Sequence, residues 1–226
     1  MATLEEALAL LRAHAHPEQL GGMARFGLVG EGRLGLSVPD MRGIAKQLKR
    51  DHDLALQLWD TGIPEAMMVA SMVDDPSLLT NEQMDSWAKD FMAWDVCDQV
   101  CMNLFEKSPL AWIKPAEWAG HEEEFVKRAA FALMACLAWH DKQASDEQFK
   151  PFLPIIAQGS TDARNFVKKA VSWALRNIGK RNKTLNEAAI EAARQIQLLD
   201  SKAARWVAAD ALKELTGEAV QRRLQD

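Results

Sequence analysis

Two segments that lie 41 residues apart in this chain have nearly the same sequence. Residues 125–130 (FVKRAA) are matched by residues 166–171 (FVKKAV), and residues 205–210 (RWVAAD) form a weaker third copy. A period of this length is typical of arrays in which each repeat is a pair of helices. Because stacked helix pairs place equivalent positions along one curved surface, the Lys and Arg residues of these copies predict a concave basic groove.

The rest of the chain is also typical of helices. Capping-box patterns begin at Thr80, Ser145 and Thr184, each just before a periodic apolar run, and no run of alternating β-branched residues occurs. Proline stands where helices are expected to begin, and glycine where the last is expected to end: Pro39, Pro64, Pro115 and Gly217. We therefore expect an all-α fold, an α–α superhelix of HEAT-like repeats, forming a single domain over residues 1–226.

Composition excludes several classes of protein. Hydrophobic residues make up 48% of the chain, yet no apolar run approaches the roughly 18 residues of a membrane span. The N-terminus lacks the pattern of a signal peptide. Cys97 and Cys101 stand one helical turn apart, which favours buried thiols over a metal site, and the five histidines show no metal-binding spacing. We expect a reduced, cytoplasmic, monomeric protein without a metal, a cofactor or a membrane partner.

Charge is divided unevenly along the chain. The net charge is −5, but residues 1–120 carry 10 basic and 18 acidic residues, whereas residues 121–226 carry 17 and 14. Seven basic residues and one acidic residue lie between positions 161 and 183. A local basic stripe can bind a polyanion even in an acidic protein, because at ordinary salt a bound polyanion experiences only the electrostatic field of charges within about 10 Å. The alternative is a solvated helix face.

Two groups of residues could act on a nucleic acid. Trp94 and Asp98 stand one helical turn apart, with Cys97, Val100 and Cys101 available for the core side. A basic face with one aromatic residue follows i, i+4, i+7, i+11 spacing: Lys169, Trp173, Arg176 and Lys180. Arg128 is the repeat equivalent of Lys169 and is expected to line the same groove. An indole can pack on a sugar or base while cations hold phosphates.

Each of these residues also has a structural interpretation. Most of the other tryptophans are expected to pack inside or at helix crossings: Trp59, Trp87, Trp112, Trp118, Trp139 and Trp206. Asp98 could simply pair with an arginine, and Asp95 could be a surface charge. Residues 21–35 hold six of the twelve glycines, which predicts an ordered loop near the site or a packing point of the first helices. This segment lacks the Gly-Lys-Ser/Thr ending of a phosphate-binding loop.

Several motifs together resemble the AlkD-type bacterial DNA alkylation repair proteins, which are HEAT-like alkylpurine DNA glycosylases. The matching positions are residues 23–26 (MARF), 35–39 (GLSVP) before Arg42, 58–60 (LWD), 94–98 (WDVCD), 128–130 (RAA) and 169–176 (KAVSWALR). The resemblance implies that Asp98 is the catalytic carboxylate and that Trp94 and Trp173 flank the sugar of the damaged nucleotide. It also implies that Arg128 and Arg176 clamp backbone phosphates.

The resemblance implies hydrolysis of the N-glycosidic bond of N3- or N7-alkylated purines in double-stranded DNA, without a base-flipping pocket. Such a purine is cationic and leaves readily, so a fixed anion that stabilises an oxocarbenium-like sugar suffices. Phe26 stands where the family usually has Tyr, Ala93 replaces the first of two tryptophans, and the net charge is acidic. The alternatives are a non-catalytic scaffold for a protein partner and a binder of DNA structures.

Overall fold

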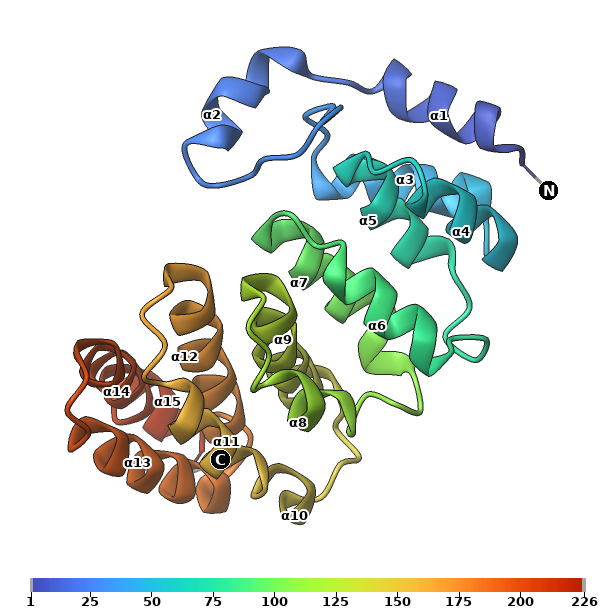
Figure 1. Ribbon diagram of the computed structural model, residues 1–226. Coiled ribbons are helices and arrows are strands. Elements are labelled where there is room, and N and C mark those ends of the chain that lie inside the picture. Colours follow the sequence, from blue (N-terminus) through green and yellow to red (C-terminus); the bar gives the residue numbers. More distant parts are fainter. Residues whose placement is uncertain (1, 225–226) are drawn as a thin grey trace. The chain divides into compact units, whose positions relative to one another are not determined.

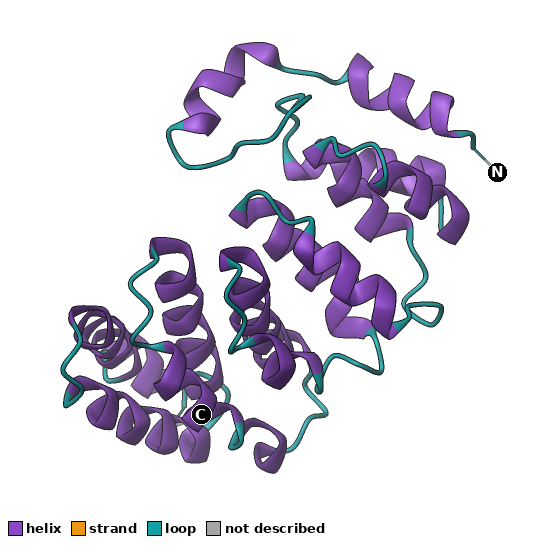
Figure 2. Cartoon of the chain, in the orientation of Figure 1, coloured by secondary structure: helices purple, strands orange, loops and turns teal. Residues whose placement is uncertain are grey.

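Residues 2–224, which the computed structural model describes, form α-helices and two short 3₁₀ helices, and no strand occurs among them (Figure 2). This architecture confirms the all-α prediction. Contacts divide the chain into two compact units, Met1–Leu110 and Ala111–Asp226. The expectation of a single domain over the whole chain stays a prediction.

The first unit holds the first nine helical segments. They are α1 (Leu4–Ala13), η1 (Pro17–Gln19), α2 (Leu20–Ala24), α3 (Val38–Leu48), α4 (His52–Trp59), α5 (Pro64–Val73), α6 (Asn81–Lys89), α7 (Trp94–Asn103) and η2 (Phe105–Lys107). Helix α5 is central, because it contacts α3, α4 and α7 and all of its residues except Met72 are buried. A helix that is apolar on nearly all sides can only be stable inside a core. Trp59 of α4 and Trp87 of α6 are both buried and stack with ring centroids 3.8 Å apart, as expected for core tryptophans.

The second unit contains the sequence repeat. Its helices are α8 (Lys114–Trp118), α9 (Glu124–His140), α10 (Asp146–Phe149), α11 (Phe152–Gly159), α12 (Asn165–Gly179), α13 (Lys183–Gln197), α14 (Lys202–Leu215) and α15 (Glu218–Arg223). Within this unit α12 packs against both α9 and α14 (Figure 1). The three copies of the repeat therefore lie near the starts of three helices, of which α12 packs against the other two.

Side chains of the repeat join α9 to α12. The rings of Phe125 and Phe166, equivalent positions of two copies, lie 5.6 Å apart. Asn177 Nδ2 donates a hydrogen bond to the carbonyl oxygen of Ala135 at 3.1 Å. Buried backbone oxygens that are satisfied in this way help to fix the register between helices.

The predicted starts and ends of helices were confirmed at some positions and wrong at others. Thr80 and Ser145 are N-caps, as predicted. The third capping box was misplaced, because α13 begins at Lys183 and is capped by Asn182, whose side chain accepts from Leu185 N. Gly217 does not end the last helix, since α15 begins directly after it.

The prediction that most of the six tryptophans pack inside or at helix crossings is confirmed. Trp118 is buried, as are Trp59 and Trp87, and Trp112 packs on the rings of Phe149 and Phe152. Trp139 and Trp206 are exposed. Among residues 2–224 no helix has the length and hydropathy needed to span a bilayer.

Candidate nucleic-acid interface

The first turns of α7 carry Asp98, the predicted catalytic carboxylate, and Trp94, which was predicted to bind DNA. Trp94 opens the helix after Ala93, and Asp98 follows one turn later; both are only partly buried. Cys97 and Cys101 on the same helix are completely buried, as the spacing predicted. The core side of α7 is therefore occupied by small apolar residues, and Trp94 and Asp98 lie away from it.

A backbone contact fixes the indole of Trp94. Its Nε1 donates a hydrogen bond to the carbonyl oxygen of Phe26 at 2.8 Å. Phe26 belongs to the glycine-rich segment and has an exposed ring. Residues 21–24 of the segment belong to α2, and residues 25–35 form an ordered loop that lies against α7 within the first unit, in line with one of the two predictions for the segment.

A buried ion pair ties the same loop to the neighbouring turn of α7. Arg33 donates to both carboxylate oxygens of Asp95, at 2.8 and 3.1 Å, and also to the carbonyl oxygen of Val29. The two charged side chains are only 4% and 15% exposed. Asp95 is thus no surface charge, contrary to one interpretation of the sequence. Bidentate arginine–carboxylate pairs are among the strongest and most directional polar contacts in proteins.

The far end of the loop is held from α5. The fully buried carboxylate of Glu65 accepts hydrogen bonds from the backbone nitrogens of Leu34 at 3.0 Å and Gly35 at 2.8 Å. Gly35 has a φ of +83°, and a Cβ atom there would lie 2.3 Å from the carbonyl oxygen of His16. Glycine at this position is therefore a requirement of the close packing between the loop and η1.

In the second unit the predicted cations have different surroundings. Lys169 is exposed, and among the described residues it forms no ion pair. Arg128, its repeat equivalent, is instead buried and donates to the carbonyl oxygen of Phe166 at 2.6 Å. Equivalence in the repeat therefore does not give equal exposure, because the Arg128 side chain contacts the next helix. Its assignment as a phosphate clamp stays a prediction.

Two further predicted cations are paired with acids of α14. Arg176 contacts Asp210 at 3.3 Å and also bonds Glu214, while Lys180 Nζ lies 2.7 Å from Glu214. Burial acts to raise the pKa of Glu214, but the hydrogen bonds from Lys180 and Arg176 outweigh it and lower the pKa. The spacing on α12 alone did not reveal these carboxylates, since they belong to a different helix.

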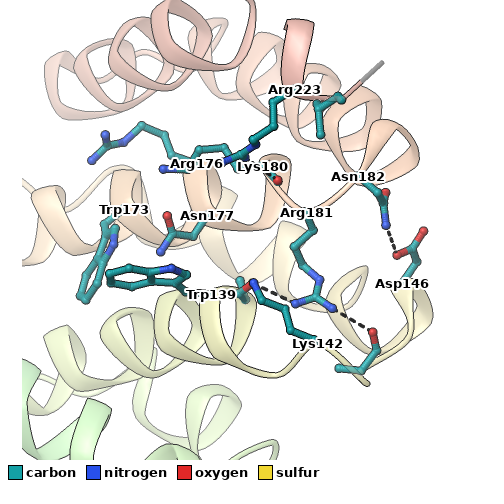
Figure 3. Close-up of a pocket in the computed structure, with 13 residues that line it drawn as sticks. Trp139, Lys142, Asp146, Trp173, Arg176, Asn177, Lys180, Arg181, Asn182 and Arg223 are labelled. Atoms are coloured by element: carbon teal, nitrogen blue, oxygen red, sulfur yellow. Dashed lines mark hydrogen bonds between the residues drawn. The ribbon is translucent and has the colours of Figure 1, made fainter. Parts of the chain in front are cut away.

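Next to these cations, the second unit contains a cavity of about 970 Å³. Residues from the last turns of α9 and α12 line this cavity together with residues near the end of α15 (Figure 3). Five cationic residues and one carboxylate line it: Lys142, Arg176, Lys180, Arg181, Arg223 and Asp146. Trp139 and Trp173 also line the cavity. Because Arg176 and Lys180 are paired with Glu214, the remaining cations Lys142, Arg181 and Arg223 provide the positive charge that attracts anions to this concave surface.

The cavity is partly rigid because Arg181 is held on several sides. Its guanidinium donates to the carbonyl oxygens of Ala138, Asp141 and Ala144 and lies 4.2 Å from the ring centroid of Phe149. Burial lowers the pKa of Arg181, although an arginine stays protonated at any physiological pH. This cation is thus fixed in place before a ligand arrives.

Of the cavity residues, the sequence predicted Trp173, Arg176 and Lys180 but not Trp139. One signal pointed to it, because Trp139 lies 41 residues before Lys180 and so shares its repeat position. Among residues 2–224 no group of three or more His, Cys, Asp or Glu side chains could hold a metal ion.

The comparison with known families decides the identity of the chain. The sequence profile of the family described as "DNA alkylation repair enzyme" matches residues 7–215. The chain belongs to this family. No curated protein matches it significantly.

Three solved structures are similar to the chain to different degrees. One, described as "A new family of proteins related to the HEAT-like repeat DNA glycosylases with affinity for branched DNA structures", has a TM-score of 0.83 and 20% identity and covers 99% of this chain and 96% of that chain. This likeness shows the HEAT-like fold. An engineered protein matches with a TM-score of 0.48, 14% identity and coverage of 94% and 90%. A designed armadillo repeat protein in complex with the peptide (KR)4 matches with a TM-score of 0.40, 15% identity and coverage of 99% and 97%.

Proposed function

We propose that the protein is an alkylpurine DNA glycosylase that removes cationic N3- or N7-alkylated purines from double-stranded DNA. Membership of the DNA alkylation repair enzyme family supports this assignment. The observation that carries it is the partly exposed pair on α7, in which Asp98 follows Trp94 by one helical turn. A scaffold that only binds a partner has no need for a carboxylate beside a fixed indole.

The reaction follows from the chemistry of the lesion. The bond between C1′ and the purine nitrogen breaks, and its two electrons stay on that nitrogen. These electrons neutralise the cationic ring, so the base leaves as a neutral purine. The carboxylate of Asp98 would stabilise the positive charge that develops on the sugar. A water molecule then bonds to C1′ and loses its proton, which Asp98 can accept.

The indole of Trp94 would pack against the sugar of the damaged nucleotide. Its hydrogen bond to the Phe26 carbonyl holds the ring in one orientation, so that little ordering is needed when DNA binds. In the second unit, Trp173 would contribute a further aromatic contact to DNA. Cations of that unit would bind backbone phosphates: Arg128, Lys169, Arg176 and Lys180.

Replacement of Asp98 by Asn tests the catalytic assignment. The side chain keeps its size and loses its charge, so the single-turnover rate of 7-methylguanine or 3-methyladenine release should fall at least about 100-fold. The affinity for duplex DNA should stay equal or improve slightly. Asp53→Asn is the matched control, because Asp53 is an exposed acid of the same unit. Release at the wild-type rate by Asp98→Asn would show that the carboxylate is not catalytic.

The second candidate function is binding of branched DNA without catalysis. It is favoured by the similar fold whose description names affinity for branched DNA structures. A four-way junction and a linear duplex of equal length distinguish the two functions. Preference for the junction by at least about tenfold, with no methylpurine released by wild-type protein, would replace the glycosylase assignment.

A further inference from the structure

The exposed tryptophan at the end of α9 has no role in the proposed reaction. Trp139 is 53% exposed, although indoles are usually covered in a folded protein. The ring of His140 stacks on it, with centroids 4.8 Å apart and an interplanar angle of 20°. His140 therefore covers one face of the indole, and the exposed surface provides a flat platform beside the cavity.

Cations line the same cavity as this platform. Lys142 follows Trp139 closely in the chain and forms no ion pair with any described residue. Arg181 is fixed by its three carbonyl contacts, and Arg223 donates to the carbonyl oxygen of Lys180 at 2.8 Å. The carboxylate of the cavity, Asp146, already accepts a hydrogen bond from Asn182 at 2.7 Å.

The combination of these groups selects a class of ligand. Phosphates can form ion pairs with the cations, and a planar aromatic ring can stack on the exposed face of the indole. In a duplex the bases are stacked on one another and present only their edges to a protein. An exposed indole platform therefore fits the face of an unpaired base, which a base stacked within a duplex cannot present.

We propose that this cavity binds an unpaired nucleotide of DNA. The base stacks on Trp139, and Lys142, Arg181 and Arg223 hold the adjoining phosphates. These four side chains are labelled in Figure 3. A volume of about 970 Å³ is at the upper end of the range for small-ligand sites, which leaves room for the flanking sugar and phosphate. The inference rests on the proposed function for the identity of the polymer as DNA, but not on catalysis.

Binding of a fluorescent single-stranded oligonucleotide tests this site. Trp139→Ala should weaken the affinity for a ten-residue thymidine strand at least about fivefold, because a stacked base contributes about 1–3 kcal/mol. Trp139→Phe should restore most of the affinity. The matched control is Trp206→Ala, since Trp206 is also exposed but packs on Lys168 outside the cavity. Equal affinities for wild-type protein and Trp139→Ala would overturn the assignment and leave Trp139 as a surface for a protein partner.

The salt dependence provides an independent readout. Lys142→Ala should reduce the slope of log affinity against log salt by about 0.7 for the single strand, whereas Lys213→Ala, an exposed lysine outside the cavity, should leave it unchanged. Free thymidine monophosphate should bind much more weakly than the strand; equal affinities would assign the cavity to free nucleotides instead. Methylpurine release from duplex DNA by Trp139→Ala should stay at the wild-type level. Loss of release in Asp98→Asn and loss of strand binding in Trp139→Ala therefore report separately on the reaction and on this site.

Discussion

Breaking the ion pair between Arg33 and Asp95 should destabilise the first unit strongly. Both side chains are largely buried, and two hydrogen bonds of 2.8 and 3.1 Å join them. Removal of one partner from a buried pair leaves an uncompensated charge and costs about 3–5 kcal/mol. For a chain of this size each kcal/mol lowers the melting temperature by about 2–4 °C, so Asp95→Asn should melt roughly 6–20 °C below the wild type.

Calorimetry with a double-mutant cycle measures this effect. The partners are replaced singly, as Arg33→Met and Asp95→Asn, and then together. Because the double variant has no buried charge left unpaired, it should be no less stable than the worse single variant. The control is Arg50→Met, which removes an exposed pair with Asp75 at 3.8 Å and should cost at most about 1 kcal/mol.

The same perturbation should also affect the reaction. The loop that carries Arg33 also supplies the Phe26 carbonyl that orients Trp94. At a temperature where Asp95→Asn is fully folded, methylpurine release should still fall by about tenfold or more, because small displacements of positioning groups are costly. Wild-type melting and wild-type release in both single variants would refute the view that this ion pair holds the loop on α7.

Three further predictions concern the second unit. Hydrogen bonds from Lys180 and Arg176 lower the pKa of Glu214, so the stability they provide is present above the ordinary glutamate pKa of 4.5 and is lost as the pH falls below it. In melts at several pH values, Glu214→Gln should therefore lose less stability than the wild type over this acid range. The same variant should bind DNA more tightly in fluorescence anisotropy, because both cations are freed. For duplex DNA, Lys169→Ala should reduce the slope of log affinity against log salt by about one unit, and Arg176→Ala should reduce it by less, because Arg176 must first leave its carboxylates. Equal slopes in both variants and the wild type would show that these residues do not contact the DNA backbone. Trp173→Ala should reduce methylpurine release while costing less stability than the 3–5 kcal/mol of a buried tryptophan, and a melting loss of that full size would identify Trp173 as a core residue.

The sequence was sufficient to predict the all-α architecture and the placement of Trp94 and Asp98 on the same helix. Its repeat predicted that helices starting near Phe125 and Phe166 pack together, because a fixed period specifies which positions are equivalent. Helical spacing likewise placed Trp94 and Asp98 away from the buried thiols of α7, since that periodicity is a local property.

Contacts between distant segments were outside the reach of this reasoning. Arg33 and Asp95 are 62 positions apart, and no periodicity relates them. Glu214 neutralises cations of another helix, which a count of charges along α12 alone cannot reveal. Most of the six other tryptophans were expected to be covered, but the sequence did not show that Trp139 is one of the exposed ones, because its exposure depends on how the ends of α9 and α12 pack.

The hydrogen bond between Trp94 and Phe26 separates the orientation of the indole from the identity of the side chain at position 26. The acceptor is a main-chain carbonyl, so any residue that keeps the loop conformation can hold Trp94 in the same pose. The ring of Phe26 is 73% exposed and contributes little to the core. Position 26 is therefore a place where mutation can change the exposed side chain, with or without a phenolic hydroxyl, at almost no risk to the geometry of its neighbour.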